Sequence, residues 1–164
     1  YISTAILQRL IEQRACLREM TLMLQREVVE RLVAKPGGKE YGYLAALVQF
    51  FCETKKLFDV PPGAFRPVPK VTSSVVQLRV RERPVAVVTD EKFLLELLSA
   101  IFAQRRKTLW NNLRAAKAKF KLDDLQLRTA LEAAQVDAQR RAETLTLEET
   151  AQLSNQLQAS FKSQ

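Results

Sequence analysis

The sequence predicts an α/β fold in which the second half of a layered sheet is followed by a small all-helical domain. Strand-like runs occur only before residue 84, whereas the pattern after residue 89 is helical throughout. Helices separate only the first two strands, which favours one mixed sheet. We therefore expect a sheet-containing segment over 1–83, a linker over 84–89 and a helical domain over 90–164.

The first segment is expected to begin with a helix that Ser3 or Thr4 can cap. The run "MTLML" is continuously apolar, as in a buried parallel strand. A following helix stops at Pro36-Gly37-Gly38, because a proline and two glycines end helices. The expected elements are a helix over 4–14, a strand over 20–24, a helix over 26–35 and a wholly buried helix over 43–51.

Two further strands are expected over 55–62 and 73–83, joined by the proline-rich stretch "AFRPVPKVTSSVV". Prolines lack the N–H group that a sheet needs and have a fixed φ, so this stretch predicts a rigid arch between two antiparallel strands. Phe65 stands at its start. From local chemistry an aromatic beside a proline is more often a packing plug than a ligand platform.

The helical domain is expected to begin where Asp90 caps a helix that runs to about residue 104. The basic stretch "QRRKTLWNNLRAAKAKFK" is expected to continue as a helix over 104–121. Thr146 and Glu149 have the spacing of a capping box. Further helices are expected over 123–134 and 146–161.

The composition, 47% hydrophobic and 27% charged residues in 164, fits a soluble globular protein. No apolar run approaches the roughly 18 residues of a membrane span, and no secretory signal pattern is present, so we expect a cytoplasmic protein without membrane association. Cys16 and Cys52 are expected to be free thiols. The chain has no histidine, which excludes Ser-His and Cys-His nucleophiles and His-ligated metals, and we expect no metal site.

The net charge of +8 favours an anionic partner, and residues 101–121 hold seven basic and no acidic residues. On a helix, Trp110, Arg114, Lys117 and Lys121 would share one face, while apolar residues face the core. A solvated basic face is the alternative, but the uncompensated charge favours nucleic acid. None of the four glycines has nucleotide-binding spacing, so no cofactor motif is visible.

Four blocks together, "YISTAIL", "MLQREVVERLVAKPGGKEYGYLAALVQFF", "VPPGAFRPVPKVTSSVVQL" and "IFAQRRKTLWNNL", resemble the bacterial small-subunit rRNA adenine N6,N6-dimethyltransferases. The resemblance covers nearly the whole chain. It implies a Rossmann-like, S-adenosylmethionine-dependent methyltransferase domain followed by a helical rRNA-binding domain. Such enzymes dimethylate two adjacent adenosines in a small-subunit rRNA hairpin.

In that family the cofactor loop and an Asn-Leu-Pro-Tyr catalytic motif precede the position that Tyr1 takes here. The resemblance therefore implies that this chain is the C-terminal portion of the enzyme, which binds RNA but does not methylate alone. Phe65 would stack on the flipped adenine, with Pro67 and Pro69 stiffening the arch. Tyr1 could extend the base pocket.

The resemblance also implies which side chains hold rRNA phosphates. Arg66 and Lys70 lie in the arch, and Arg105, Arg106 and Lys107 match the family's QRRKT block at the start of the basic helix. Arg114, Lys117 and Lys121 would follow on that helix. Trp110 departs from the family pattern and would either stack on a base or close the core.

Two alternatives to the methyltransferase stay open. The chain could be a self-standing RNA or DNA adaptor that uses the 105–121 face and is indifferent to Phe65. It could also be a structural helical protein whose basicity is incidental.

Overall fold

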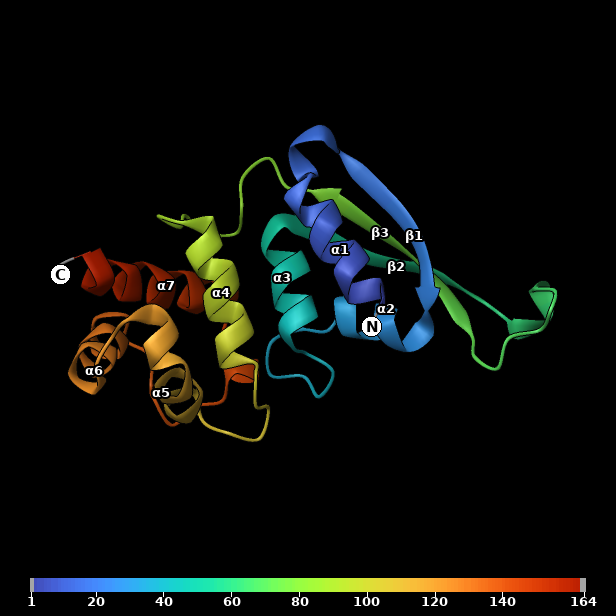
Figure 1. The fold of residues 1–164 in the computed structure, drawn as a ribbon. Helices are drawn as coiled ribbons and strands as arrows, with labels where there is room; N and C mark the ends of the chain where they lie inside the picture. The colour runs from blue at the N-terminus through green and yellow to red at the C-terminus, as the bar shows by residue number, and fades with distance from the viewer. Residues whose placement is uncertain (1, 163–164) are drawn as a thin grey trace. The chain divides into compact units, whose positions relative to one another are not determined.

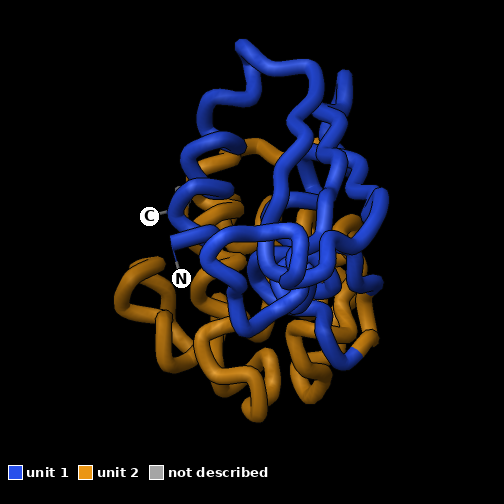
Figure 2. The backbone as a smooth tube through the Cα atoms, turned by 90° about the vertical axis from the view of Figure 1, so that its right-hand side faces the viewer, with its two compact units in different colours: residues 1–35, 39–85 blue, residues 36–38, 86–164 orange. Residues whose placement is uncertain are grey.

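The computed structural model describes residues 2–162 and divides the chain into two compact units. Unit 1 comprises residues 1–35 and 39–85, and unit 2 comprises residues 36–38 and 86–164 (Figure 2). Unit 1 contains the sheet and unit 2 is helical.

Unit 1 contains three helices and a three-stranded sheet within the described residues (Figure 1). Short 3₁₀ turns follow α1 at Arg14–Cys16 and β2 at Pro62–Ala64. The elements are α1 (Ile2–Glu12), β1 (Glu19–Gln25), α2 (Arg26–Leu32), α3 (Tyr43–Phe51), β2 (Cys52–Val60) and β3 (Ser73–Val80).

The sheet has the order β1-β3-β2, and β3 is antiparallel to both neighbours. The arch thus joins an antiparallel pair, as predicted. The expectation of a buried parallel strand over 20–24 is wrong, because β1 runs antiparallel to its described neighbour and Met23 is 52% exposed. The continuous apolar run suggested burial on both faces of the strand, but one face of β1 is largely buried and the other is exposed.

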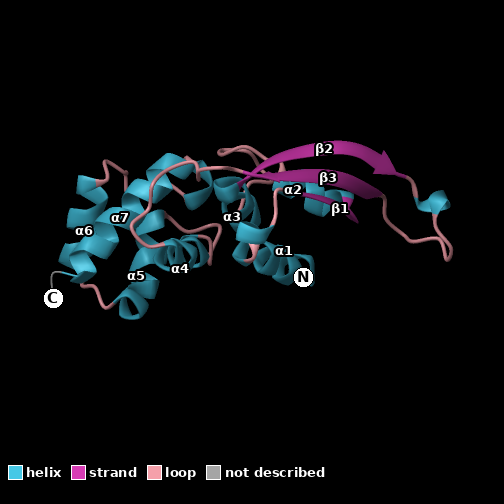
Figure 3. Ribbon diagram, turned by 90° about the horizontal axis from the view of Figure 1, so that it is seen from above, coloured by secondary structure: helices cyan, strands magenta, loops and turns pink. Residues whose placement is uncertain are grey.

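Helices α1, α2 and α3 lie on one side of the sheet (Figure 3). The residues Met20, Val76 and Leu78 are buried. Helix α3 is almost wholly buried, as its apolar sequence predicted, and ends where Cys52 turns extended and enters β2. Burial raises the pKa of the Cys52 thiol to about 11, whereas Cys16 is exposed; both cysteines are free.

Unit 2 holds α4 (Glu91–Ile101), α5 (Leu109–Phe120), α6 (Asp124–Ala133) and α7 (Leu147–Lys162), with a 3₁₀ turn at Ala142–Thr144. Asp90 accepts a hydrogen bond from the Phe93 N–H and caps α4, as predicted. The capping box at the start of α7 is also confirmed, with Thr146 and Glu149 each accepting the other's backbone N–H.

The end of the predicted 84–89 linker is attached to α7. The Asn155 side chain accepts the Thr89 N–H at 2.8 Å and donates to the Val87 carbonyl at 3.0 Å. In addition, the Gln158 amide donates to the Asp90 carboxylate at 2.9 Å. These bonds hold the entry to α4 against α7 within unit 2.

None of the described helices is long and apolar enough to cross a membrane. Residues 2–162 likewise contain no group of three or more Cys, Asp or Glu side chains that could hold a metal ion.

Candidate nucleic-acid interface

The arch over residues 61–72 projects beyond the ends of β2 and β3 (Figure 3). A 3₁₀ turn at its start places Phe65 in an extended conformation, with the Phe65 N–H donating to the Pro62 carbonyl at 3.2 Å. The Phe65 side chain is partly exposed, and the Arg66–Pro67 peptide bond is cis. The arch therefore presents an aromatic ring outside the buried core of the sheet.

Polar contacts hold the base of the arch. The Asp59 carboxylate accepts the Ser74 hydroxyl at 2.5 Å and pairs with Lys56 at 2.7 Å. Both hydrogen bonds lower the pKa of Asp59, and the bond from Lys56 has the larger effect. The Arg26 N–H donates to the Thr72 carbonyl at 3.0 Å and links the end of the arch to the start of α2.

The other predicted arch residues are largely solvent-facing. Arg66 and Lys70 are both exposed, and the Arg66 guanidinium donates to the Phe65 carbonyl at 3.2 Å. Pro67 is exposed and Pro69 is half-buried. Tyr1 lies outside the described residues.

The basic residues Arg105, Arg106 and Lys107 lie in a loop between α4 and α5, and the prediction of a single helix over 104–121 is wrong. Thr108 starts α5 by accepting the Asn111 N–H at 3.3 Å, so the helix begins after the basic triplet. Arg105 pairs with Glu143 at 3.2 Å. No ion pair involves Arg106 or Lys107 among residues 2–162, and both are exposed.

The Asn112 side chain holds the backbone at the start of this basic loop. Its side chain is buried, donates to the carbonyls of Ile101 and Gln104 at 2.9 and 3.1 Å, and accepts the Gln104 N–H at 3.2 Å. A buried amide that meets three backbone groups fixes their geometry. Asn112 thus joins the end of α4 to the start of the loop.

Farther along α5 the basic face is partly neutralised. Arg114 and Lys117 both pair with Asp124, the first residue of α6, at 3.0 and 2.8 Å. The Lys117 hydrogen bond, followed by the Arg114 charge, lowers the pKa of that carboxyl. Lys121 ends α5 in a left-handed conformation with φ 52°. Along the loop and α5, Arg106 and Lys107 are therefore adjacent basic side chains that have no acidic partner among the described residues.

A model of the ribosomal RNA adenine dimethylase family matches residues 1–158. The chain belongs to this family. The chain is 45% identical over 157 residues to ribosomal RNA small subunit methyltransferase A of Bacillus cytotoxicus, and equally so to that of Bacillus mycoides. Each match takes in 96% of the chain but 54% of the relative, so the chain spans about half the length of these relatives.

Two solved structures share the fold. A dimethyladenosine transferase from Plasmodium falciparum superposes with a TM-score of 0.77 at 25% identity, over 99% of this chain and 63% of that one. The 23S rRNA methyltransferase ErmE gives a TM-score of 0.61 at 21% identity, over 96% and 61%. The α/β methyltransferase fold class predicted from the sequence is confirmed.

Sequence reasoning missed two features that shape the basic surface of unit 2. Asn112 looks like its exposed neighbour Asn111 in the sequence, and no local pattern shows that it is buried. Similarly, the acid that neutralises Arg114 and Lys117 comes from the next helix. Asp124 follows Arg114 by ten residues and Lys117 by seven, and this short separation was the available signal in the sequence. The ion pairs form only because α5 packs against α6.

Proposed function

We propose that this chain forms the RNA-engaging portion of an S-adenosylmethionine-dependent 16S rRNA (adenine-N6,N6)-dimethyltransferase. The enzyme would dimethylate two adjacent adenosines in a small-subunit rRNA hairpin, during ribosome biogenesis in the cytoplasm. The observation that carries the proposal is the partly exposed Phe65 on a rigid arch, in a chain whose family match spans residues 1–158.

Phe65 would provide one wall of the target-base pocket. A base in a duplex is unreachable for chemistry, so the target adenine must leave its stack, and an aromatic ring compensates for the lost stacking by about 1 to 3 kcal/mol. Pro67 and Pro69 restrict the backbone of the arch. Because the arch is anchored through Asp59 and Ser74, the ring would be positioned before the base arrives.

The loop carrying Arg106 and Lys107 would hold rRNA phosphates. Phosphate contacts fix the position of an RNA without reading its sequence. Arg105, Arg114, Lys117 and Lys121 would contribute less, because Arg105 has an acidic partner, Arg114 and Lys117 share one and Lys121 makes further contacts of its own. Arg66 and Lys70 would contact the RNA beside the flipped base.

The described residues do not fit a cradle for S-adenosylmethionine, which supplies the methyl group in this class of enzyme. Such cradles place glycines in the turn from a strand to a helix, whereas β1 passes into α2 through Gln25 and Arg26. Gly37, Gly42 and Gly63 lie instead in loops or a 3₁₀ turn. We therefore propose that the isolated chain binds RNA and does not transfer methyl groups.

RNA binding by the isolated chain tests the phosphate-contact role. Gel mobility of a small-subunit rRNA hairpin should show binding that weakens with salt. The double substitution Arg106→Ala/Lys107→Ala should lower the slope of log affinity against log salt by about 2. Lys35→Ala/Lys39→Ala removes the same charge from unit 1 and should change it less. Equal effects of the two variants would contradict a specific role for the loop.

The stacking role of Phe65 needs an assembled active site. A hybrid that joins this chain to the N-terminal half of a Bacillus relative should methylate small-subunit particles. Phe65→Ala should slow transfer by about 10- to 100-fold, the rate equivalent of one lost base stack. Phe58→Ala removes an exposed aromatic from β2 and serves as the control. Full activity of the Phe65 variant would exclude the stacking role.

A further inference from the structure

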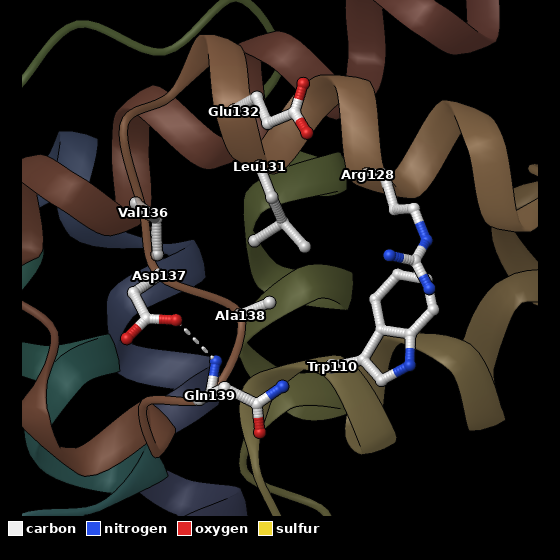
Figure 4. A pocket seen from close by; sticks show the side chains of 8 residues that line it. All are labelled: Trp110, Arg128, Leu131, Glu132, Val136, Asp137, Ala138 and Gln139. Carbon is white, nitrogen blue, oxygen red and sulfur yellow. Dashed lines mark hydrogen bonds between the residues drawn. The ribbon is translucent and has the colours of Figure 1, made fainter.

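A pocket of about 280 Å³ lies within unit 2, between the first turn of α5, the end of α6 and the segment that follows α6 (Figure 4). Its floor is apolar, since Leu131 is 2% and Val136 5% exposed. The backbone N–H of Trp110 donates to the Ala138 carbonyl at 3.0 Å and joins the first turn of α5 to the segment that follows α6. Neither the arch nor the basic loop contributes a residue to its lining.

One side of the pocket is a stacked pair. The Arg128 guanidinium lies over the Trp110 ring, 4.7 Å from its centroid. Arg128 stands four residues before Glu132 on α6, a spacing that permits an ion pair. Yet neither side chain has an ion pair within residues 2–162, because the guanidinium packs on the indole instead.

Away from Trp110 the pocket carries carboxylates (Figure 4). Glu132 is exposed and has both oxygens available as acceptors. One Asp137 oxygen accepts the Gln139 N–H at 2.9 Å, which orients that carboxylate at the rim. The pocket therefore combines a planar cation–aromatic platform with acceptor-only groups.

We propose that this pocket binds an unpaired guanine base of RNA, stacked on the Trp110–Arg128 pair and donating to the carboxylate of Glu132 or Asp137. RNA as the source rests on the proposed function. Proteins commonly recognise unstacked RNA bases by stacking them on aromatic rings or guanidinium planes. The volume suits a single base rather than a larger ligand.

The carboxylates select the base. Guanine carries two adjacent donors on its Watson–Crick edge, N1–H and the N2 amino group, which match the two oxygens of one carboxylate. Adenine, cytosine and uracil each place a ring or carbonyl acceptor beside their donor, so a carboxylate would be repelled there. Guanine is the base that satisfies both oxygens.

Trp110 is the only tryptophan of the chain, so its indole N–H gives a single reporter signal in a ¹⁵N-correlated NMR spectrum. Titration with guanosine monophosphate should shift this signal saturably. Inosine monophosphate, which lacks only the N2 amino group, should bind about tenfold more weakly. Adenosine monophosphate should bind more weakly still, and ribose 5-phosphate should leave the signal in place.

Two variants localise the effect. Glu132→Gln or Asp137→Asn should weaken guanosine monophosphate by about tenfold, because an amide presents a donor to one of the base donors. Glu148→Gln removes an exposed carboxylate from the first turn of α7 and should have no effect.

Equal shifts with the guanosine and inosine nucleotides, or none with either, would overturn the proposal. So would a saturable shift with N-acetyl-arginine amide alone, which would indicate a basic protein segment as the occupant. In each case the rRNA hairpin should still bind through the basic loop. Loss of hairpin binding by the unmodified chain would instead overturn the proposed function.

Discussion

The Asn112 side chain holds the backbone at the start of the basic loop through three hydrogen bonds. It is 3% exposed, and its amide contacts the carbonyls of Ile101 and Gln104 and the Gln104 N–H. If the amide is removed, these backbone groups lose their partner while still largely shielded from water. Asn112 would thus be a positioning residue, which acts on RNA through Arg106 and Lys107.

We expect Asn112→Leu to destabilise unit 2 by about 2 to 3 kcal/mol and to weaken rRNA binding in conditions where the chain stays folded. Urea unfolding followed by circular dichroism gives the first quantity and gel mobility gives the second. Asn111→Leu, the same change at the exposed neighbour, should leave both unchanged. A variant that loses stability but retains full RNA affinity and its salt dependence would show that Asn112 is only structural.

The sequence predicted the identity of the basic residues but not their relative availability. Charge counting placed Arg106 and Arg114 in one stretch with equal standing. Only the structure separates them, because Asp124 reaches Arg114 from the next helix while Arg106 has no acidic partner in the described part of the chain. Contacts between helices depend on packing, which a single stretch of sequence does not encode.

The start of α7 combines a capping box with a charged pair. The Arg140 guanidinium contacts both Glu149 oxygens at 2.6 and 3.0 Å and donates to the Thr144 carbonyl. The Arg140 carbonyl in turn accepts the Leu109 N–H at 2.7 Å. The Arg140 hydrogen bonds, with a smaller contribution from the Thr146 N–H, lower the pKa of Glu149. This cluster therefore links the first turns of α5 and α7.

Glu149→Gln should destabilise unit 2 by about 1 to 2 kcal/mol at pH 7. A lowered folded-state pKa stabilises the fold above the unfolded value of about 4.3, and this contribution is lost as the pH falls through the folded value. The difference between variant and parent should therefore shrink below about pH 4. Urea unfolding at pH 7 and pH 3 measures it, with Glu148→Gln as control. A difference independent of pH would exclude the charged pair as its origin.

Local signals predicted the elements well where they were chemically distinct. Asp90 and Thr146 marked helix starts that the structure confirms, because side-chain caps depend on neighbouring residues alone. The single helix expected over 104–121 was wrong because the prediction did not take the local capping signal at Thr108 into account. The triplet at 105–107 favours helix as much as residues 109–120 do, and the cap at Thr108 was overlooked.

At the scale of the whole chain, the order of the elements correctly predicted an α/β fold followed by a helical part. The directions of the strands were harder to predict from the sequence. The apolar run at 20–24 favoured a parallel strand, but β3 lies between β1 and β2 and opposes both. Pairing partners are set by long-range contacts. The same register creates an exposed apolar row, in which Met23, Val75 and Phe58 stand side by side on the three strands.

This row should make the chain self-associate. Met23 is 52% and Phe58 57% exposed, and both lie beside strand edges for which no further strand is described among residues 2–162. Exposed apolar strands near open edges favour association between copies. We expect sedimentation velocity to show a mass that rises with concentration, and Met23→Lys to reduce this rise by placing a charge in the row. Val87→Lys, at an 89% exposed site in unit 2, adds the same charge and should not. If both variants suppressed association equally, net charge would explain the effect and the apolar row would not.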